Sequence, residues 1–332
     1  MREANTGRDE RIPVILITGF LGSGKTTLLR RMLDHSALAR SAVLVNEFGD
    51  VAIDDRLVRA RAGELVTLES GCLCCSLRDG LTFTLRDLDR RCRNGEIPAI
   101  DRVLIETTGL ADPAPILLSL ATDDTISEHY RLAGVLVTVD TANGWRQLDR
   151  QPEAVRQLAA ADQILLTKID LAESAEVERL ADRVEAINPG AAVHRVLQGE
   201  IAPDRLLSEN TGPAAPSRAA FEAPHDHSHD PDLDCFSVAI DTPPERRAFE
   251  TWLTILLAHR ADDLLRIKGV LRFAGEDHSV LVNGLGGLLH PFEPVGASVA
   301  GGGPSHLVFI TRRLPASVIR ESLRAAIDLA AA

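Results

Sequence analysis

The sequence has no long apolar run and no excess of basic residues, and each absence excludes a class of protein. No apolar run approaches the ~18 residues that a membrane-spanning helix needs, so we expect no membrane segment. The first ten residues, MREANTGRDE, contain no apolar stretch, so we expect no secretory signal. Acidic residues outnumber basic ones by 48 to 36, which gives a formal net charge of −12. This balance argues against nucleic acid or an anionic membrane as a partner.

Cysteine is also scarce, and its distribution is uneven. Only five of the 332 residues are cysteine, and three of them stand within four consecutive positions. A secreted disulfide framework is not expected from this distribution, so the sequence predicts a cytoplasmic protein whose thiols stay reduced. The length suits two domains of the usual ~100–200 residues each. The hydrophobic content of 45% is sufficient for genuine cores.

The first two thirds of the chain alternate short apolar, β-branched runs with helical patterns. Near-continuous apolar strands separated by helices predict an α/β domain with a mostly parallel sheet that is covered on both faces. The expected strands are residues 14–18, 42–47, 102–107, 134–140 and 163–167.

The composition changes after this region and divides the chain. Proline, alanine, serine, aspartate and histidine dominate residues 198–233, which predicts a linker. The order strand–helix–three strands–helix that follows predicts a smaller α+β domain with its helices on one face of an antiparallel sheet. We therefore predict an N-terminal tail (1–11), the α/β domain (12–197), the linker (198–233) and the α+β domain (234–332).

The segment GFLGSGKT fits the phosphate-binding pattern G-x-x-x-x-G-K-[ST] and lies between a predicted strand and a predicted helix, as such a loop requires. Its glycines let backbone N–H groups face phosphates, and the helix N-terminus adds positive potential. Lys25 is predicted to reach the β- and γ-phosphates, and the Thr26 hydroxyl is predicted to bind Mg²⁺. The predicted nucleotide contacts of this loop are Gly19, Gly22, Ser23, Gly24, Lys25, Thr26 and Thr27.

A second segment expected at the nucleotide and Mg²⁺ site is VLIETTG. In it, Glu106 ends an apolar strand and Gly109 follows three residues later. A carboxylate at the end of a buried strand is costly unless it meets a cation or hydrogen-bond donors. Glu106 is therefore the predicted Mg²⁺-side carboxylate, and the Gly109 amide the predicted γ-phosphate sensor. No arginine finger or activating glutamine is evident beside this segment, so we predict slow intrinsic turnover. The predicted catalytic set is Lys25, Thr26, Glu106 and Gly109.

The segment QILLTKID ends a strand with Thr167, Lys168 and Asp170, the T-K-x-D form of the guanine-binding motif N-K-x-D. Guanine presents two donors, N1–H and N2–H₂, which one carboxylate accepts together, whereas adenine has an acceptor at N1. Hydrogen bonds to a charged group are worth ~1.5–3 kcal/mol each. We therefore expect GTP to be preferred over ATP by at least ~100-fold.

The cysteine-rich segment SGCLCCSLRDG contains Cys72, Cys74 and Cys75. Adjacent cysteines have poor geometry for a disulfide, whereas thiolates are ligands for soft ions such as Zn²⁺. The alternative is that these residues are small apolar side chains that fill the end of a strand. The isolated Cys92 and Cys235 are predicted to be packing residues.

Taken in order, GFLGSGKTTLL, VNEFGD, GCLCC, ETTGLADP and TKID resemble the CobW family of P-loop GTPases. The segment RIKGVLRFAGEDHSVLVNG and the later SHLVFITRR resemble the C-terminal domain of that family, so the resemblance covers nearly the whole chain. It implies a P-loop GTPase domain followed by an α+β domain, and a GTP-dependent metallochaperone or metal-insertion factor. The implied cofactors are GTP, Mg²⁺ and Zn²⁺ (or Co²⁺).

By position, the resemblance also implies roles for individual residues. Lys25 and Thr26 handle phosphate and Mg²⁺, and Glu106 belongs to the second switch. Asp170 reads guanine, and the transported ion is held by Cys72, Cys74 and Cys75.

Two positions depart from the pattern of the family. Thr167 stands where many GTPases have asparagine, which leaves the rigidity of the base-binding loop open. Val45 occupies a position where some relatives carry a carboxylate, so no metal ligand is available there.

Three thiolates leave one position open on a tetrahedral ion, and an open site allows the ligand exchange that delivery requires. The candidates for the fourth ligand are water, a client thiolate, Glu47 and Asp50. The two carboxylates can also be interpreted as solvated charges of a loop. If GTP orders the segment NEFGD, metal and GTP must tighten the binding of each other. The linker contains three histidines at alternate positions, His225, His227 and His229. They either bind metal weakly or only keep the linker solvated.

The sequence thus predicts a GTP-hydrolysing metallochaperone that transfers Zn²⁺ or Co²⁺ to a client apo-metalloenzyme or metal-insertion complex, as a monomer or homodimer. Two other functions fit parts of the pattern: a GTP-dependent metal-sensing regulator that delivers nothing, and a small-molecule kinase built on the same phosphate loop. Cargo transfer to an apo-enzyme separates the first two functions. GTPase activity without an acceptor excludes the third.

Overall fold

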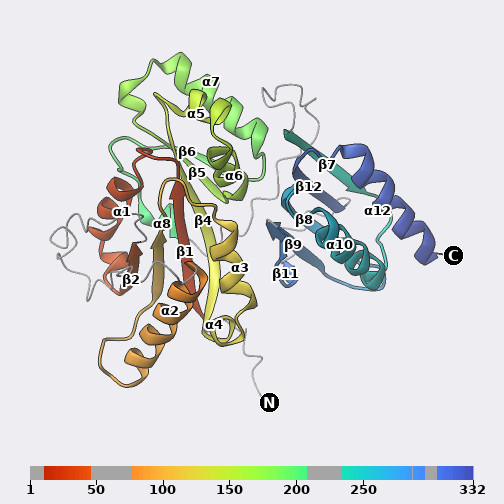
Figure 1. Ribbon diagram of the computed structural model, residues 1–332, viewed down its shortest axis with the longest axis horizontal. Coiled ribbons are helices and arrows are strands. Elements are labelled where there is room, and N and C mark those ends of the chain that lie inside the picture. Colours follow the sequence, from red (N-terminus) through yellow and green to blue (C-terminus); the bar gives the residue numbers. More distant parts are fainter. Residues whose placement is uncertain (1–10, 46–76, 208–232, 286, 296–304, 332) are drawn as a thin grey trace.

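The computed structural model describes residues 11–45, 77–207, 233–285, 287–295 and 305–331. These residues form two sheets, one from each part of the chain, and each sheet has its own helices (Figure 1).

The first sheet has six strands in the order β2-β3-β1-β4-β5-β6, and all of its pairings are parallel. Its apolar strands face helices on both sides, as the near-continuous apolar runs of the sequence predict. The strands are β1 (Ile12–Gly19), β2 (Ser41–Val45), β3 (Arg102–Glu106), β4 (Tyr130–Asp140), β5 (Gln163–Thr167) and β6 (Ala192–Arg195).

The alternation of side chains along β1 separates two hydrophobic clusters. Ile15 and Ile17 join one cluster with α1 (Lys25–Leu33), η1 (Ser36–Leu38) and α8 (Pro203–Leu207). Val14 and Leu16 face the opposite cluster, which contains side chains of the remaining helices of this part of the chain. Those helices are α2 (Leu77–Arg93), α3 (Ala114–Thr122), α4 (Asp124–His129), α5 (Gly144–Arg150), α6 (Pro152–Ala160) and α7 (Ser174–Ile187).

Helix α8 lies within residues 198–233, which the sequence analysis assigned to a linker. Leu206 of this helix is buried, and its carbonyl oxygen accepts a hydrogen bond of 3.1 Å from Gln163 Nε2 at the start of β5. The beginning of the predicted linker therefore packs on the first sheet. Composition missed this because a single buried leucine is enough to anchor a helix of five residues.

The second sheet is antiparallel, in the order β10-β9-β8-β12-β7, with β11 paired to β9. Helices α10 (Arg246–Arg260) and α12 (Ala316–Ala331) pack on one face, around aromatic side chains that include Phe249, Phe273 and Phe309. This is the predicted α+β arrangement. The strands are β7 (Leu233–Ile240), β8 (Leu264–Arg272), β9 (Ser279–Leu285), β10 (Leu288–Leu289), β11 (Glu293–Val295) and β12 (Ser305–Arg312).

The opposite face of the second sheet packs against the first domain through a buried ion cluster. Arg266 and Lys268 of β8 both point to this face because one residue separates them. Arg266 donates to Ala160 O (2.7 Å) and to Asp162 Oδ1 (2.6 Å). Lys268 donates to Asp162 Oδ1 (3.1 Å) and to Gly190 O (3.2 Å). Two buried cations thus share one carboxylate across the domain boundary.

We expect Asp162→Asn to lower the free energy of unfolding by ~3–5 kcal/mol, because it leaves two cations buried without their anion. Burial opposes ionisation of Asp162, but Lys268 and Arg266 overcome it and hold its pKa far below the usual range. A lowered folded-state pKa gives stability that is present at neutral pH and is lost in acid. Urea unfolding should therefore show a difference between the two proteins that begins to narrow below pH ~4 and is still largely present at pH ~3, because the folded-state pKa of Asp162 lies well below that pH.

The matched control is Asp101→Asn, which removes a carboxylate from an exposed ion pair with Arg40. Such pairs contribute ~1 kcal/mol at most. Equal losses for the two variants at pH 7 would contradict the role given to the buried cluster.

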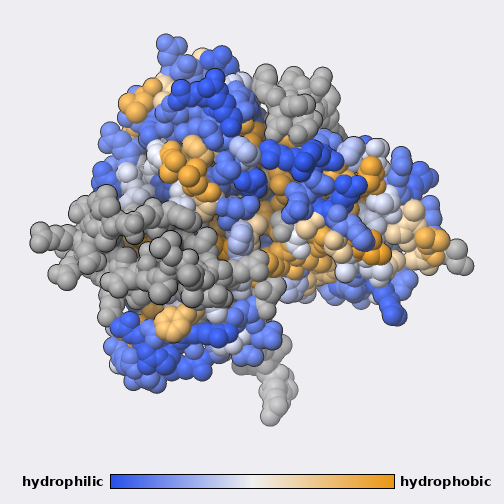
Figure 2. Space-filling model, in the orientation of Figure 1, coloured by the Kyte–Doolittle hydropathy of each residue, from blue (hydrophilic) through white to orange (hydrophobic). Residues whose placement is uncertain are grey.

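The surface over helices α5 and α7 of the first domain is mostly hydrophilic. Figure 2 shows mostly hydrophilic residues over α5 and α7, with apolar residues only in small groups. Within the described residues, no helix combines the length and the apolar character that crossing a membrane requires.

Candidate functional site

Three loops meet at the carboxyl end of the parallel sheet. They follow the neighbouring strands β1 and β3 and the nearby strand β5. Since the carboxyl ends of parallel strands share one edge of a sheet, this is where an open α/β sheet binds its ligands.

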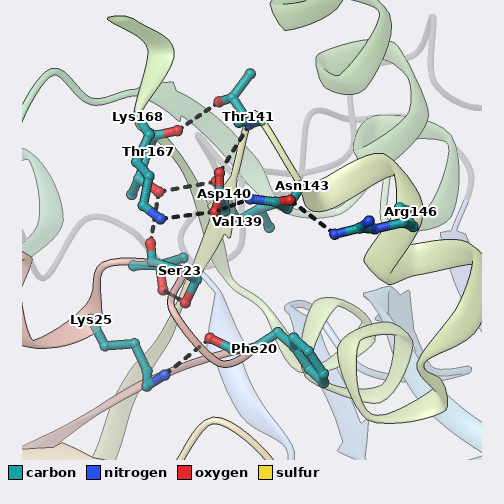
Figure 3. Close-up of polar contacts among 12 residues, drawn as sticks. Phe20, Ser23, Lys25, Val139, Asp140, Thr141, Asn143, Arg146, Thr167 and Lys168 are labelled. Carbon is teal, nitrogen blue, oxygen red and sulfur yellow. Dashed lines mark hydrogen bonds and ion pairs between the residues drawn. The ribbon is translucent and has the colours of Figure 1, made fainter. Parts of the chain in front are cut away.

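The phosphate loop joins β1 to α1. Gly24 caps the helix at φ 95°, a left-handed conformation that favours glycine. Lys25 is buried, and its ammonium group donates to Gly19 O (2.9 Å) and to Phe20 O (3.2 Å), as Figure 3 shows for Phe20. Burial lowers the pKa of Lys25, and the charge of Glu106 partly opposes that effect. The lysine therefore lies within the loop, at the helix N-terminus.

The other predicted contacts of this loop differ in what they offer. The Ser23 hydroxyl is fully buried and lies 2.6 Å from Thr138 Oγ1, so Ser23 can offer a nucleotide only its backbone. Gly22 has positive φ and open space around its Cα. Thr27 is exposed on the first turn of α1.

The clearest contact in the site joins the phosphate loop to β3. Thr26 Oγ1 donates a hydrogen bond of 2.6 Å to Glu106 Oε1, and Glu106 is only 4% exposed. Mg²⁺ prefers oxygen ligands and takes few of them from protein. The donor set that the sequence predicts for Mg²⁺ is thus adjacent, and its chemistry fits that ion.

The loop after β3 lies against the phosphate loop. Thr107 donates through its backbone N–H to Ile17 O (3.0 Å) and through its hydroxyl to Thr18 Oγ1 (2.8 Å). At Gly109, an added Cβ would be 2.6 Å from Leu21 N. Only glycine fits this approach, which puts the predicted phosphate-sensing residue in contact with the phosphate loop.

A glutamine from α6 also reaches this loop. Gln157 is buried, and its Nε2 donates to Gly109 O (3.1 Å) and to Ala111 O (3.0 Å). No glutamine stands near Gly109 in the sequence, because Gln157 is 48 positions away along the chain. Its only signal in the sequence is a polar side chain within the apolar pattern of a helix.

The predicted base-binding loop after β5 is connected to the phosphate loop by Thr167. Its hydroxyl donates to Ser23 O (2.7 Å), and its carbonyl accepts from the hydroxyl of Thr141 (2.7 Å) (Figure 3). The sequence left open whether threonine at this position holds the loop. The hydrogen bond to Ser23 connects Thr167 directly to the phosphate loop, and the hydrogen bond from Thr141 connects it to the segment after β4.

Lys168 of this loop pairs with Asp140 at the end of β4 (Figure 3). Lys168 has φ 55°, and its Nζ lies 2.9 Å from Asp140 Oδ2. Asp140 is buried, which favours the neutral acid, but hydrogen bonds from Lys168 and Asn143 lower its pKa below the usual value. Asp170 is exposed on the short helix η2 (Ile169–Leu171). Neither Asp140 nor Asn143 was predicted, although Asp140 ends an apolar strand just as Glu106 does.

Several predicted residues lie outside the described residues. Among the described ranges, no group of three or more histidine, cysteine, aspartate or glutamate side chains is arranged to hold a metal ion. The predictions that fall outside are Glu47, Asp50, Cys72, Cys74, Cys75, His225, His227 and His229.

The two isolated cysteines do lie within the described residues. Cys92 and Cys235 pack against the hydrophobic cluster that includes α2, as predicted. Burial raises the pKa of both thiols, that of Cys235 to about 12. Neither thiol is therefore a ready thiolate ligand.

Sequence profiles of two domains match the chain. Residues 13–195 match the CobW/HypB/UreG nucleotide-binding domain, and residues 233–327 match the cobalamin synthesis protein cobW C-terminal domain.

Curated relatives match over most of their length. The zinc chaperone YjiA of Escherichia coli is 38% identical over 277 residues, covering 82% of this chain and 86% of YjiA. The zinc chaperone CobW of a Sinorhizobium species is 28% identical over 319 residues, covering 85% and 87%. The crystal structure of the Zn(II)-bound YjiA GTPase superposes with a TM-score of 0.70 at 33% identity, over 95% of this chain and 99% of that one.

Proposed function

The chain belongs to the CobW family of P-loop GTPases, and from this premise we propose that it is a GTP-hydrolysing metallochaperone that carries Zn²⁺ to a client metalloprotein. Curated relatives of the chain bear the names zinc chaperone and zinc-regulated GTPase metalloprotein activator. These names support Zn²⁺ as the cargo ahead of Co²⁺, and an apo-metalloprotein or metal-insertion complex as the partner. Action in the cytoplasm, as a monomer or homodimer, is part of the same proposal.

One observation carries the nucleotide part of this proposal. The Thr26 hydroxyl lies 2.6 Å from the Glu106 carboxylate, so oxygen ligands from the phosphate loop and from β3 meet at one point. A carboxylate with so little exposure is costly without a cation or donors nearby. The pairing is what a Mg²⁺–nucleotide site needs, and a structural glycine loop would not need it.

Each residue of the site has a part in hydrolysis of GTP to GDP and phosphate. The Lys25 ammonium and the backbone N–H groups of the loop offset negative charge on the β- and γ-phosphates. Bound Mg²⁺ would add Lewis-acid stabilisation of the phosphate charge, with Thr26 and Glu106 holding it. The Gly109 N–H is the proposed donor to the γ-phosphate, and Thr167 keeps the base loop joined to the phosphate loop.

We expect Asp170→Asn to weaken GTP binding and to relax the preference for guanine. In an amide, one of the two carboxylate oxygens is replaced by an NH₂ group, which only donates, so the side chain cannot accept from both guanine donors in the same way. The loss in GTP affinity should be ~10–100-fold, the worth of about one hydrogen bond to a charged group. Fluorescence competition with GTP and ATP measures both effects, and Asp182→Asn on the exposed face of α7 is the control. Equal affinity of the unmodified protein for ATP and GTP would refute the assignment of Asp170.

The cargo site in this proposal consists of Cys72, Cys74 and Cys75, with one coordination position left for exchange. Glu47 and Asp50 remain candidates for that position. If GTP favours the arrangement that binds metal, then metal must favour GTP binding by the same factor. Hydrolysis would then weaken the metal site and release the ion to the client.

A metal competition titration tests this proposal. The reduced protein is titrated with Zn²⁺ against a chromophoric chelator, with Mg²⁺ and either GDP or a non-hydrolysable GTP analogue. We expect tighter Zn²⁺ binding with the analogue, and a reciprocal gain in analogue affinity with Zn²⁺. Identical Zn²⁺ affinities in the two nucleotide states would exclude GTP-driven metal transfer.

A further inference from the structure

Helix α6 contacts both the loop after β3 and the C-terminal domain. Near its middle, Gln157 binds the carbonyl oxygens of Gly109 and Ala111, and Arg156 pairs with Asp112 at 3.1 Å. At its end, the carbonyl oxygen of Ala160 accepts from Arg266 of β8. One helix of nine residues therefore contacts both the predicted phosphate-sensing loop and the buried ion cluster of the other domain.

The amide of Gln157 is only half used. Both of its N–H contacts go to the loop, whereas Oε1 is buried and has no hydrogen-bond partner among the described residues. The hydroxyl of Thr108, in the same loop, is also buried without a partner there. Buried polar groups without partners are costly, and they are rare unless another arrangement of the chain satisfies them.

We propose that Gln157 is a positioning residue that sets the orientation of the Gly109 peptide and transmits movement of this loop through α6 to the C-terminal domain. The inference rests on the proposed GTP-dependent function and adds a regulatory connection to it. Gln157 touches neither nucleotide nor metal in this scheme. It acts through the backbone of the loop.

The geometry explains why one side chain has this effect. The carbonyl of Gly109 belongs to the Gly109–Leu110 peptide and that of Ala111 to the Ala111–Asp112 peptide. Fixing both carbonyls therefore restrains the backbone of the loop on either side of Leu110 and Ala111. A loop that shifts toward a γ-phosphate must either carry Gln157 and α6 with it or break two hydrogen bonds. In a shifted loop, Oε1 and the Thr108 hydroxyl are available to form new ones.

The cleft between the domains lies next to this loop. A cavity of about 430 Å³ is lined by Asp112 and Arg156 on the side of the loop, and by Asp262, Leu265 and Arg313 of the C-terminal domain. Because Asp112 follows the loop directly and pairs with Arg156, a displacement of the loop changes one wall of this cleft. A change from GDP to GTP at the nucleotide site would thus change the contacts of the C-terminal domain at this cleft.

A buried glutamine elsewhere in the same domain serves as a matched control. Gln163 is also buried, at the amino end of β5 and away from the phosphate loop; its Nε2 donates to Leu206 O at 3.1 Å, and its Oε1 lies 3.1 Å from His194 Nε2. If Gln157 only satisfied backbone carbonyls, Gln157→Leu and Gln163→Leu would lower stability alike and leave nucleotide discrimination alone.

The test compares these two variants with the unmodified protein. We expect Gln157→Leu to reduce the ratio of GTP-analogue affinity to GDP affinity by roughly tenfold, the worth of two neutral hydrogen bonds. It should lower kcat more than it raises KM, and Gln163→Leu should keep the ratio of the unmodified protein. Hydrogen exchange at residues 261–265 and 312–313 should respond to the analogue in the unmodified protein and in Gln163→Leu, but not in Gln157→Leu.

Gln157→Glu provides a second test of the role of Gln157 if Gln157→Leu fails to fold. A carboxylate cannot donate to Gly109 O or Ala111 O, whereas a protonated carboxyl donates one hydrogen bond. Burial raises the pKa of a carboxyl. Nucleotide discrimination in this variant should therefore recover as the pH is lowered from 8 to ~5.5, while the unmodified protein shows no such recovery.

The outcomes separate the inference from the function on which it rests. A protein that binds no GTP overturns both. A protein that hydrolyses GTP, with Gln157→Leu equal to Gln163→Leu in nucleotide discrimination and hydrogen exchange, overturns only the inference. Absence of acid recovery in Gln157→Glu also counts against it.

Discussion

We expect Cys74→Ser to lower Zn²⁺ affinity by orders of magnitude while leaving metal-free GTP binding unchanged. Serine keeps the size of the side chain, but its hydroxyl ionises poorly near neutral pH. Metal binding requires deprotonated ligands, and each thiolate contributes substantially. The phosphate loop uses none of these cysteines, so the nucleotide affinity should be independent of the substitution. The same loss is expected for substitutions of Cys72 and Cys75.

Competition titration with a chelator measures the Zn²⁺ affinity, and Co²⁺ provides an independent signal. In the analogue-bound protein, Co²⁺ should give the intense absorption of tetrahedral thiolate ligation, and Cys74→Ser should abolish it. Cys92→Ser is the control, because Cys92, near the end of α2, packs against the hydrophobic core. Full nucleotide-dependent Zn²⁺ affinity in Cys74→Ser would mean that these cysteines fill space, and the metallochaperone proposal would fall with them.

We expect Lys25→Ala to abolish GTP turnover, with a loss of at least ~10²-fold. The buried ammonium of Lys25 lies at the N-terminus of α1, where its predicted task is to offset charge on the β- and γ-phosphates. The fold should survive, since the contacts of Lys25 that are lost are hydrogen bonds to two carbonyls of a loop.

Release of phosphate under single-turnover conditions measures this effect, and circular dichroism checks the fold. Arg30→Ala, an exposed substitution on the same helix, should behave like the unmodified protein. Substantial residual turnover in Lys25→Ala would show that the loop after β1 is not the phosphate site.

Most of the fold could be predicted from the sequence because the strands are short, nearly continuous apolar runs. The apolar run at 163–167 coincides with β5, and the regular alternation of β and α patterns led to the parallel sheet that the structure contains. In the C-terminal domain, the two predicted helices do cover one face of an antiparallel sheet. The domain limits remain predictions, and α8 shows that a composition change does not mark where packing ends.

The site was predictable only where function imposes local spacing. The phosphate loop, Glu106 and Thr167 lie in short motifs whose order along the chain carries the signal. Asp140 and Gln157 lack such motifs, because their partners are 28 and 48 positions away along the chain. Likewise, Arg266 lies in an ordinary strand pattern, and nothing local reveals that its partner Asp162 is in the other domain. Long-range pairing of polar groups leaves little trace in one sequence.

The boundary between the two sheets has a consequence for how the chain can be divided. Leu265, Leu285 and Ile310 of the C-terminal sheet belong to the same hydrophobic cluster as the helices of the first domain. Expressed alone, the N-terminal half would expose this apolar surface to solvent, and the Asp162 carboxylate would lose its cationic partners. We expect this half to aggregate. A cut made between residues 208 and 232 should instead leave two fragments that stay together and co-purify, as the subunits of a heterodimer do.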